Sequence, residues 1–243
     1  MTEWGAVDDL YDNYLGNYYE AKLRPSEGYT AFREAKFAHN YLDLLAPHRA
    51  GTLLEIGPGM GEFLRFVTTK GNYTSARGVD YAPDCVEHCR GLGLDVEHIS
   101  DLAPWLDQHQ DEFAAIVMLH VLEHIPKTDT IDVLSTIRRS LKPGGVLIAE
   151  VPNAGNPWLS GIARYEDFTH QVGYTSGSLQ FVMARAGFHD VSVRGVKVPW
   201  KSKYGPVRLA SEVGNGITKV MTKLSAPRAD HLLDAQIFAV ATA

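Results

Sequence analysis

Short apolar runs alternate with segments of helical spacing along most of this 243-residue chain. Runs such as Thr52–Ile56 and Phe113–Leu119 are too short for a typical helix and almost uniformly apolar, so they predict strands buried on both faces. Between these runs, apolar residues recur every three or four positions, as on one face of a helix. This alternation predicts an α/β fold, with a mostly parallel sheet covered by helices on both faces.

The pattern allows each element to be placed along the chain. We expect strands at Thr52–Ile56, Ala76–Val79, Asp95–Ile99, Phe113–Leu119, Gly145–Val151, Val191–Val198 and Ala235–Ala241. We expect helices at Thr30–Leu45, about 61–70, Pro83–Leu92, Thr128–Leu141 and Ser176–Ala186. No internal repeat or low-complexity linker divides the sequence. A single domain over residues 1–243 is therefore favoured, with residues 1–45 as an N-terminal helical cover.

Two longer segments interrupt the alternation, residues 153–176 after the fifth strand and residues 199–232 before the last one. In open α/β sheets, ligands bind beyond the carboxyl ends of the strands. The first segment begins at such an end. We expect the two insertions to form a lid over a substrate.

The overall composition disfavours several classes of function. A hydrophobic content of 45% and a charged content of 21% are typical of a chain that buries a core. The net charge of −6 argues against binding to a nucleic-acid backbone, so no nucleic-acid partner is expected. No apolar stretch approaches the roughly 20 residues of a membrane helix, and the N-terminal residues lack the pattern of a secretion signal. We therefore expect a cytoplasmic protein.

A glycine-rich turn, Glu55–Gly61 (EIGPGMG), joins the first predicted strand to the next helix. Glycine permits a tight turn, a positive φ and close approach to a ligand. The dinucleotide fingerprint is GxGxxG, whereas Gly61 follows Gly59 by only two residues. Glu55, which stands before the first glycine of the turn, would disfavour a pyrophosphate and favour a cationic ligand. A tight turn without any ligand remains the alternative.

Polar residues also follow the next strands. Asp80 closes the second predicted strand, where a carboxylate can accept hydrogen bonds from both hydroxyls of a ribose. Asp101 and Leu102 close the third, where an acceptor and an apolar contact could hold an adenine. The fourth strand ends in Leu119–Pro126 (LHVLEHIP). The carboxyl edge of the sheet thus carries the groups that a nucleoside needs.

In this order and spacing, the motifs resemble those of the class I S-adenosylmethionine-dependent methyltransferases. The resemblance is to the branch with an E-x-G-x-G-x-G loop, an HVLEH segment and an LKPGG turn, and it covers about residues 30–190. It implies a Rossmann-like, seven-stranded sheet whose last strand is antiparallel. It also implies S-adenosylmethionine as the cofactor and S-adenosylhomocysteine as the product.

The resemblance further implies which residues border each part of the cofactor. These are Glu55, Gly57, Gly59 and Gly61 at the methionine part, Asp80 at the ribose, Tyr81, Asp101 and Leu102 around the adenine, and His120 near the sulfonium.

Three histidines are candidates for the catalytic base that a hydroxyl acceptor needs: His120, His124 and His170. His170 lies in the first insertion, three residues after Asp167, and a carboxylate that orients an imidazole suits a general base. A solvated polar loop is the alternative for this segment, and a supporting role in the helix after the fourth strand is the alternative for His124. His120 and His124, four residues apart, could instead hold a metal ion, with Asp167 or His170 completing the site. The branch that the chain resembles generally works without one, so no metal is expected.

The segment "PN…D-x-x-H…T" after the fifth strand resembles that of bacterial methyltransferases found with surface-polysaccharide and sugar-modifying genes. It implies O-methylation of a sugar or glycan hydroxyl, on an acceptor that could be phosphorylated or nucleotide-linked. O- or N-methylation of a small or quinone-type molecule is an alternative. From other classes, an NAD-dependent dehydrogenase or epimerase and a non-catalytic cofactor-binding domain stay open.

The second insertion is basic, whereas the chain as a whole is acidic. Between residues 197 and 228, Glu212 is the only acidic residue against seven basic ones, which are Lys197, Lys201, Lys203, Arg208, Lys219, Lys223 and Arg228. Apolar residues recur there roughly at helical spacing. One interpretation is an amphipathic helix packed on the sheet or on a second subunit of a homodimer. The other is a basic cover for an anionic acceptor or a peripheral contact with a membrane surface.

Overall fold

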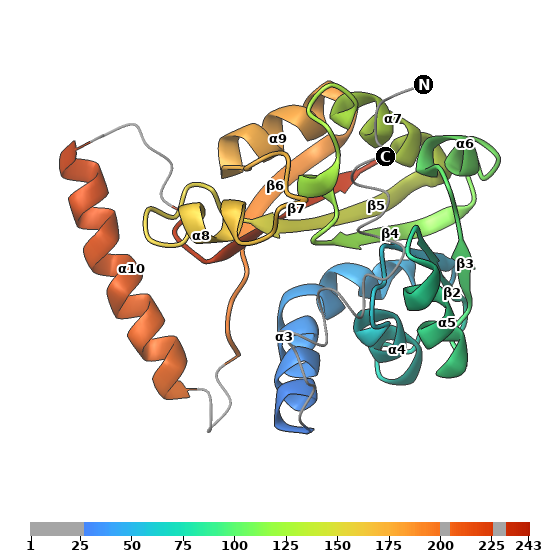
Figure 1. Cartoon of the computed structure of the whole chain (residues 1–243), viewed down its shortest axis with the longest axis horizontal. Coiled ribbons are helices and arrows are strands. Elements are labelled where there is room, and N and C mark those ends of the chain that lie inside the picture. Colours follow the sequence, from blue (N-terminus) through green and yellow to red (C-terminus); the bar gives the residue numbers. More distant parts are fainter. Residues whose placement is uncertain (1–26, 200–204, 226–231) are drawn as a thin grey trace.

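The computed structural model describes residues 27–199, 205–225 and 232–243, and within these ranges one seven-stranded sheet forms the centre of the molecule (Figure 1). Its strand order is β3-β2-β1-β4-β5-β7-β6. The strands are β1 (Thr52–Ile56), β2 (Ala76–Asp80), β3 (Val96–His98), β4 (Phe113–Leu119), β5 (Leu141–Pro152), β6 (His189–Gly195) and β7 (Gln236–Thr242). Strands β1 to β5 pair in parallel, whereas β7 runs antiparallel to both β5 and β6. The expected Rossmann-like sheet with an antiparallel last strand is confirmed.

Helices cover both faces of the sheet, as expected of buried parallel strands. In Figure 1, α3 (Glu27–Leu45), α4 (Glu62–Thr69) and α5 (Pro83–Gly91) lie below the sheet. Above it lie α6 (Leu102–Asp107), α7 (Thr130–Ser140) and α9 (Ser176–Arg185). Two further helices, α8 (Ser160–Tyr165) and α10 (Gly205–Ser225), belong to the two insertions.

Successive residues of a strand point to opposite faces, so one strand serves two cores. In β1, Leu53 packs in the core between the sheet and α3, α4 and α5, whereas Leu54 packs in the core between the sheet and α6, α7 and α9. In β4, Val117 packs in the first of these cores and Met118 in the second. Burial on both sides explains why these strands are almost continuously apolar.

The structure shifts several predicted boundaries, and β6 spans His189–Gly195 where Val191–Val198 was expected. β3 ends at His98, and Asp101 lies instead at the N-cap of α6, where its Oδ1 accepts a hydrogen bond from the backbone N–H of Ala103 at 3.2 Å. Helix α6 has six residues, too few for periodicity to reveal it. β5 begins at Leu141, which pairs with Phe113, and a register shift separates this pair from the pair of Ala115 and Val146.

The first insertion is fixed to the sheet at both of its ends. Asn153 and Tyr174 form an isolated β-bridge. The side-chain amide of Asn153 donates to the carbonyls of Leu232 and Asp234, at 2.7 and 2.9 Å. This segment, which includes α8, therefore starts and ends at the carboxyl edge of β5.

The second insertion forms the 21-residue helix α10, which continues through Gly214 and Gly216. It does not pack flat on the sheet but stands at the left edge of the molecule, beyond α8 (Figure 1). Lys201, Lys203 and Arg228 lie outside the described residues, as do residues 1–26 of the expected N-terminal cover. None of the described helices is long and apolar enough to cross a membrane.

Candidate active site

The glycine loop between β1 and α4 has the backbone that its sequence predicts. Gly57, Gly59 and Gly61 have φ angles of +69°, +51° and +69°, which residues with a Cβ rarely adopt. A Cβ at Gly57 would also lie only 2.6 Å from Cγ2 of Val121. Glycine at these positions therefore favours a loop that exposes its backbone at the carboxyl end of β1.

Glu55, the last-but-one residue of β1, lies under this loop and is buried. Its Oε2 has no hydrogen-bond partner among the residues that the structure describes. Burial disfavours the charged form and raises the pKa of this carboxyl to about 8. A buried acceptor without a partner is costly, so the site is suited to a ligand that brings a donor or a positive charge.

Asp80, at the end of β2, holds the glycine loop in place. Its Oδ2 accepts a hydrogen bond from the backbone N–H of Gly59 at 3.0 Å, and its Oδ1 accepts one from Ala82 at 2.9 Å. Burial raises the pKa of Asp80, and backbone hydrogen bonds from Ala82, Gly59 and Tyr81 oppose that effect. A carboxylate has about four acceptor positions, so part of its acceptor capacity remains for a ribose.

The residues expected around an adenine lie together beside Asp80. The hydroxyl of Tyr81 accepts a hydrogen bond from the backbone N–H of Leu102 at 2.8 Å. Leu102 is buried, whereas Tyr81 is exposed. Asp101, directly before Leu102, caps α6. The ends of β2 and β3 thus form one wall of the candidate cofactor site.

His120, directly after β4, adopts a left-handed backbone conformation with φ +59°. Its Nδ1 lies 3.3 Å from Oε1 of Glu123, and its Nε2 lies 3.0 Å from Oε1 of Glu150. Both carboxylates are buried. Such backbone strain in a non-glycine residue is typical of functional sites. The two carboxylates hold the imidazole at the carboxyl end of β4.

A second cluster lies where the first insertion meets the end of β4. Nδ1 of His124 lies 2.8 Å from Oγ1 of Thr169. The Thr169 hydroxyl in turn donates to Oδ1 of Asp167 at 2.6 Å. Since this hydroxyl has one proton and gives it to the carboxylate, it accepts from His124, whose Nδ1 is the protonated nitrogen. Burial lowers the pKa of His124, which favours this neutral form.

His170 lies against the same cluster. Its Nδ1 is 2.7 Å from the carbonyl oxygen of Ala163, and its Nε2 is 3.8 Å from Oδ2 of Asp167 and 3.9 Å from Oε1 of Glu123. The rings of His124 and His170 pack edge to face with centroids 4.7 Å apart. The structure thus brings Asp167 and His170 within reach of each other, as their spacing suggested, and it adds His124 to them. Among the described residues, Glu123 links His120 to this cluster.

Glu123 lies at the centre of this cluster, although the sequence motifs did not single it out. Its carboxylate lies between His120 and His170, its Oε2 has no partner among the described residues, and its carbonyl accepts from the backbone N–H groups of Gln171 and Val172. Glu123 therefore joins the insertion to the end of β4. The sequence contained a signal, since a glutamate between Leu122 and His124 is a charge in a largely apolar run.

A family model described as a methyltransferase domain matches residues 29–193, which is more than half of the chain. The chain belongs to this family.

Solved structures of methyltransferases have the same fold. An S-adenosylmethionine-dependent methyltransferase from Archaeoglobus fulgidus superimposes with a TM-score of 0.67 at 23% identity, over 96% of this chain and 100% of the other. Phosphoethanolamine N-methyltransferase 2 from Haemonchus contortus, in complex with S-adenosylmethionine, gives 0.55 at 17% identity over 96% and 59%. The CurJ carbon methyltransferase gives 0.56 at 17% identity over 90% and 56%. No curated protein matches the sequence.

The methyltransferase uses S-adenosylmethionine, and the contacts described above fit this cofactor. The unpartnered Oε2 of Glu55 suits a cationic methionine group, and the left-handed glycine loop leaves room for close approach. The free acceptor positions of Asp80 suit a ribose. The family assignment also removes the basis for an NAD-dependent enzyme.

The burial of Glu55 predicts a pH-dependent stability. The folded-state pKa of about 8 lies above the unfolded value near 4.5, so the folded protein binds more protons between these pH values and loses stability as the pH rises through them. We expect Glu55→Gln to remove this loss. Between pH 6 and 8, the free energy of unfolding of the wild type should fall by about 2 kcal/mol relative to that of the variant.

Urea unfolding of the cofactor-free protein at several pH values would measure this difference. The exposed Glu87, on α5, provides the control Glu87→Gln, which should follow the wild type. Parallel curves for wild type and Glu55→Gln would contradict the prediction.

The cluster around His170 also has the composition of a cation site. Glu123, His124 and His170 can each offer a ligand atom, and these atoms lie within 4.8 Å of one another. A carboxylate with two imidazoles is a ligand set found with zinc and iron. His120, which the sequence suggested as a partner of His124, does not belong to this group.

Proposed function

We propose that this methyltransferase methylates a hydroxyl of a sugar or glycan, with His170 as the general base. The observation that carries the proposal is the environment of the His170 ring. Because a carbonyl oxygen can only accept, the contact of Nδ1 with Ala163 places the proton of the neutral imidazole on Nδ1. The lone pair is therefore on Nε2.

The carboxylates beside Nε2 support its role as a base. A hydroxyl acceptor loses its proton as it is methylated, and His170 Nε2 would take that proton. The resulting imidazolium would lie between Asp167 and Glu123, whose carboxylates are 3.8 and 3.9 Å from Nε2. Bound S-adenosylmethionine supplies a methyl group activated by a sulfonium, so that a C–O bond forms as the C–S bond breaks. An amine with a free lone pair would not need such a base.

The other candidate residues hold this arrangement in place. Through Thr169, His124 fixes the carboxylate of Asp167, and Asp167 faces His170. His120 has both ring nitrogens beside carboxylates, so it is suited to orienting Glu123 near the sulfonium. We assign Asp167, His124 and His120 to positioning, and we propose a metal-free reaction.

Polar and apolar groups both line the adjacent small cavity. Beside His170 it is lined by Glu123, Ser160 and Arg164, together with apolar residues such as Pro152 and Val172. Carboxylate, hydroxyl and guanidinium groups can hydrogen-bond to several hydroxyls of one acceptor. Arg164 could also bind the phosphate of a phosphorylated or nucleotide-linked sugar.

A small aromatic or quinone-type acceptor is the second candidate. Two aromatic side chains of the first insertion support it, since Tyr165 and Phe168 are among the most exposed apolar residues of the described chain. These two aromatic rings, which precede and follow Asp167 in the sequence, could stack on a planar acceptor.

Labelled S-adenosylmethionine would distinguish these acceptors. We expect label in a methyl ether when the enzyme is incubated with nucleotide sugars or surface glycans, and none with amines or quinols. Label found only with a quinol or an amine would refute the sugar hydroxyl. Activity should survive exhaustive chelation. Loss of activity that Zn²⁺ or Fe²⁺ restores would instead assign Glu123, His124 and His170 to a metal ion.

A further inference from the structure

Helix α10 has an apolar face along its whole length. Leu209, Val213, Ile217, Val220 and Leu224 follow one another at intervals of four, four, three and four residues, which is the spacing of one helix face. Each of these side chains is between 55% and 81% exposed. An apolar face of this size is usually covered by a partner or a membrane.

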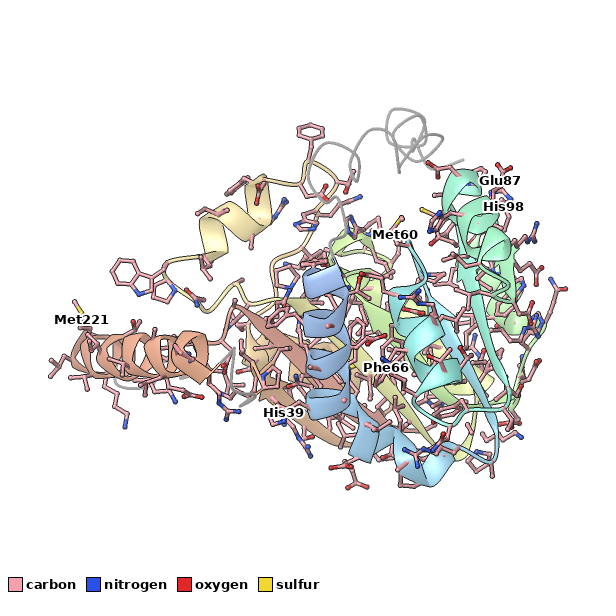
Figure 2. The ribbon with its side chains drawn as sticks, turned by 90° about the horizontal axis from the view of Figure 1, so that it is seen from below. His39, Met60, Phe66, Glu87, His98 and Met221 are labelled. Atoms are coloured by element: carbon pink, nitrogen blue, oxygen red, sulfur yellow. The ribbon has the colours of Figure 1, made fainter. Side chains whose placement is uncertain are left out.

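The opposite, polar face of α10 is the one that contacts the rest of the protein. Thr218 is buried, and its Oγ1 accepts a hydrogen bond from Nε1 of Trp158 at 2.9 Å. Arg208 donates to the carbonyl of Val198 at 3.1 Å. On a helix, Arg208 and Thr218 lie on the side away from Val213 and Ile217. The apolar face therefore points outward, and Figure 2 shows Met221 at the outer edge of the molecule.

The segment that holds α10 adds apolar surface beside it. Trp158 contacts Thr218 through its indole nitrogen, yet 67% of its surface is exposed. Leu159 and Ile162, in the next residues and in α8, are exposed as well. Tryptophan, with an apolar ring and one polar group, is favoured where an apolar layer meets water.

The charge around α10 indicates what covers this face. Lys219 and Lys223 are exposed, while Glu212 lies 3.8 Å from both Lys197 and Arg208. From residue 197 to 228 the sequence has seven basic residues and one acidic residue, a net charge of +6 in a chain of net charge −6. Two copies of such a segment would repel each other, whereas a surface of phosphate groups would attract it.

We propose that the outward face of α10, together with Trp158, binds the surface of a bilayer that contains anionic phospholipids. The apolar side chains would enter the boundary between headgroups and acyl chains, while the lysines stay at the phosphates. A helix that lies in the membrane surface needs this combination of an apolar face and basic residues, and does not need to span the bilayer.

Binding in this way has a consequence for the acceptor, which rests on the proposed function. Ser160, Ala163 and Arg164 of α8 line the cavity beside His170, and Trp158, just before α8, contacts α10. A docked enzyme would therefore hold its acceptor cavity close to the membrane. We infer that the acceptor hydroxyl belongs to a glycan carried on a lipid.

Vesicle flotation tests the membrane contact without any acceptor. We expect the full chain to float with vesicles of phosphatidylcholine and phosphatidylglycerol, and not with phosphatidylcholine alone. The double variant Val213→Asp/Ile217→Asp should lower the bound fraction at least tenfold. Ser211→Asp/Asn215→Asp is the matched control, because it adds the same charges at the same spacing on the other face of α10. This control should retain most of the binding.

Three results would overturn the proposal. These are no flotation with anionic vesicles at low salt, equal loss in both double variants, and binding that salt does not weaken. A dimer that Val213→Asp/Ile217→Asp converts to a monomer, without vesicle binding by the wild type, would assign the face to a second copy of the chain. The affinity of each variant for S-adenosylmethionine, measured in parallel, shows whether the fold is intact. Failure to methylate any sugar would leave the flotation result standing.

Discussion

Replacing His170 by glutamine is expected to lower kcat by roughly 10²- to 10⁴-fold, the usual contribution of a general base. Glutamine keeps a donor for the carbonyl of Ala163 but cannot take a proton at the position of Nε2. Affinity for S-adenosylmethionine should change little, because His170 lies in the insertion and not in the glycine loop. Single-turnover kinetics with saturating cofactor would measure the chemical step, and calorimetry would measure the affinity.

The comparison needs a histidine that has no role in the site. His189, exposed on β6, provides it, and His189→Gln should retain full activity. A His170→Gln variant that keeps the single-turnover rate of the wild type would rule out His170 as the base.

Replacing Asp80 by alanine is expected to weaken binding of S-adenosylmethionine about 100-fold or more. Each hydrogen bond to a charged group contributes about 1.5–3 kcal/mol, and the variant would lose the two from a ribose. It would also lose the contacts with Gly59 and Ala82 that hold the loop. Isothermal calorimetry with S-adenosylhomocysteine avoids turnover and gives the affinity directly.

Two further variants separate these effects. Asp80→Asn keeps one carbonyl acceptor for the loop, so it should bind more tightly than Asp80→Ala but more weakly than the wild type. Glu87→Ala removes an exposed carboxylate from the neighbouring α5 and should bind like the wild type. Near-wild-type affinity in Asp80→Ala would refute the assignment of Asp80 to the ribose.

The strands and the glycine loop were predictable because their signals are local. A strand buried on both faces must be apolar at consecutive residues, and β1 and β4 coincide with the predicted Thr52–Ile56 and Phe113–Leu119. A left-handed turn favours glycine, and Gly57 and Gly61 both have φ +69°. Where such local signals are weak, as in the six-residue α6, the prediction failed.

The cluster around His170 could be predicted only in part. The three-residue spacing of Asp167 and His170 suggested that they could meet. The contact of Thr169 with His124 joins residues 45 positions apart, and no local pattern reveals it. Glu150 likewise reaches His120 from a neighbouring strand. The contact of Glu150 with His120 depends on the register of β4 and β5, because the register determines which residues lie opposite each other.

Local patterns in the sequence specify the sheet, the cofactor loop and the groups at the carboxyl ends of the first strands, because short-range sterics and apolar periodicity act between near neighbours in the chain. The tertiary structure sets the environment of these groups. It buried Glu55 and Glu123 away from water and fixed the protonated nitrogens of His124 and His170. It also turned the apolar face of α10 outward, since the contacts of Thr218 and Arg208 choose the side that packs. Burial, proton position and orientation depend on neighbours that are distant in the chain.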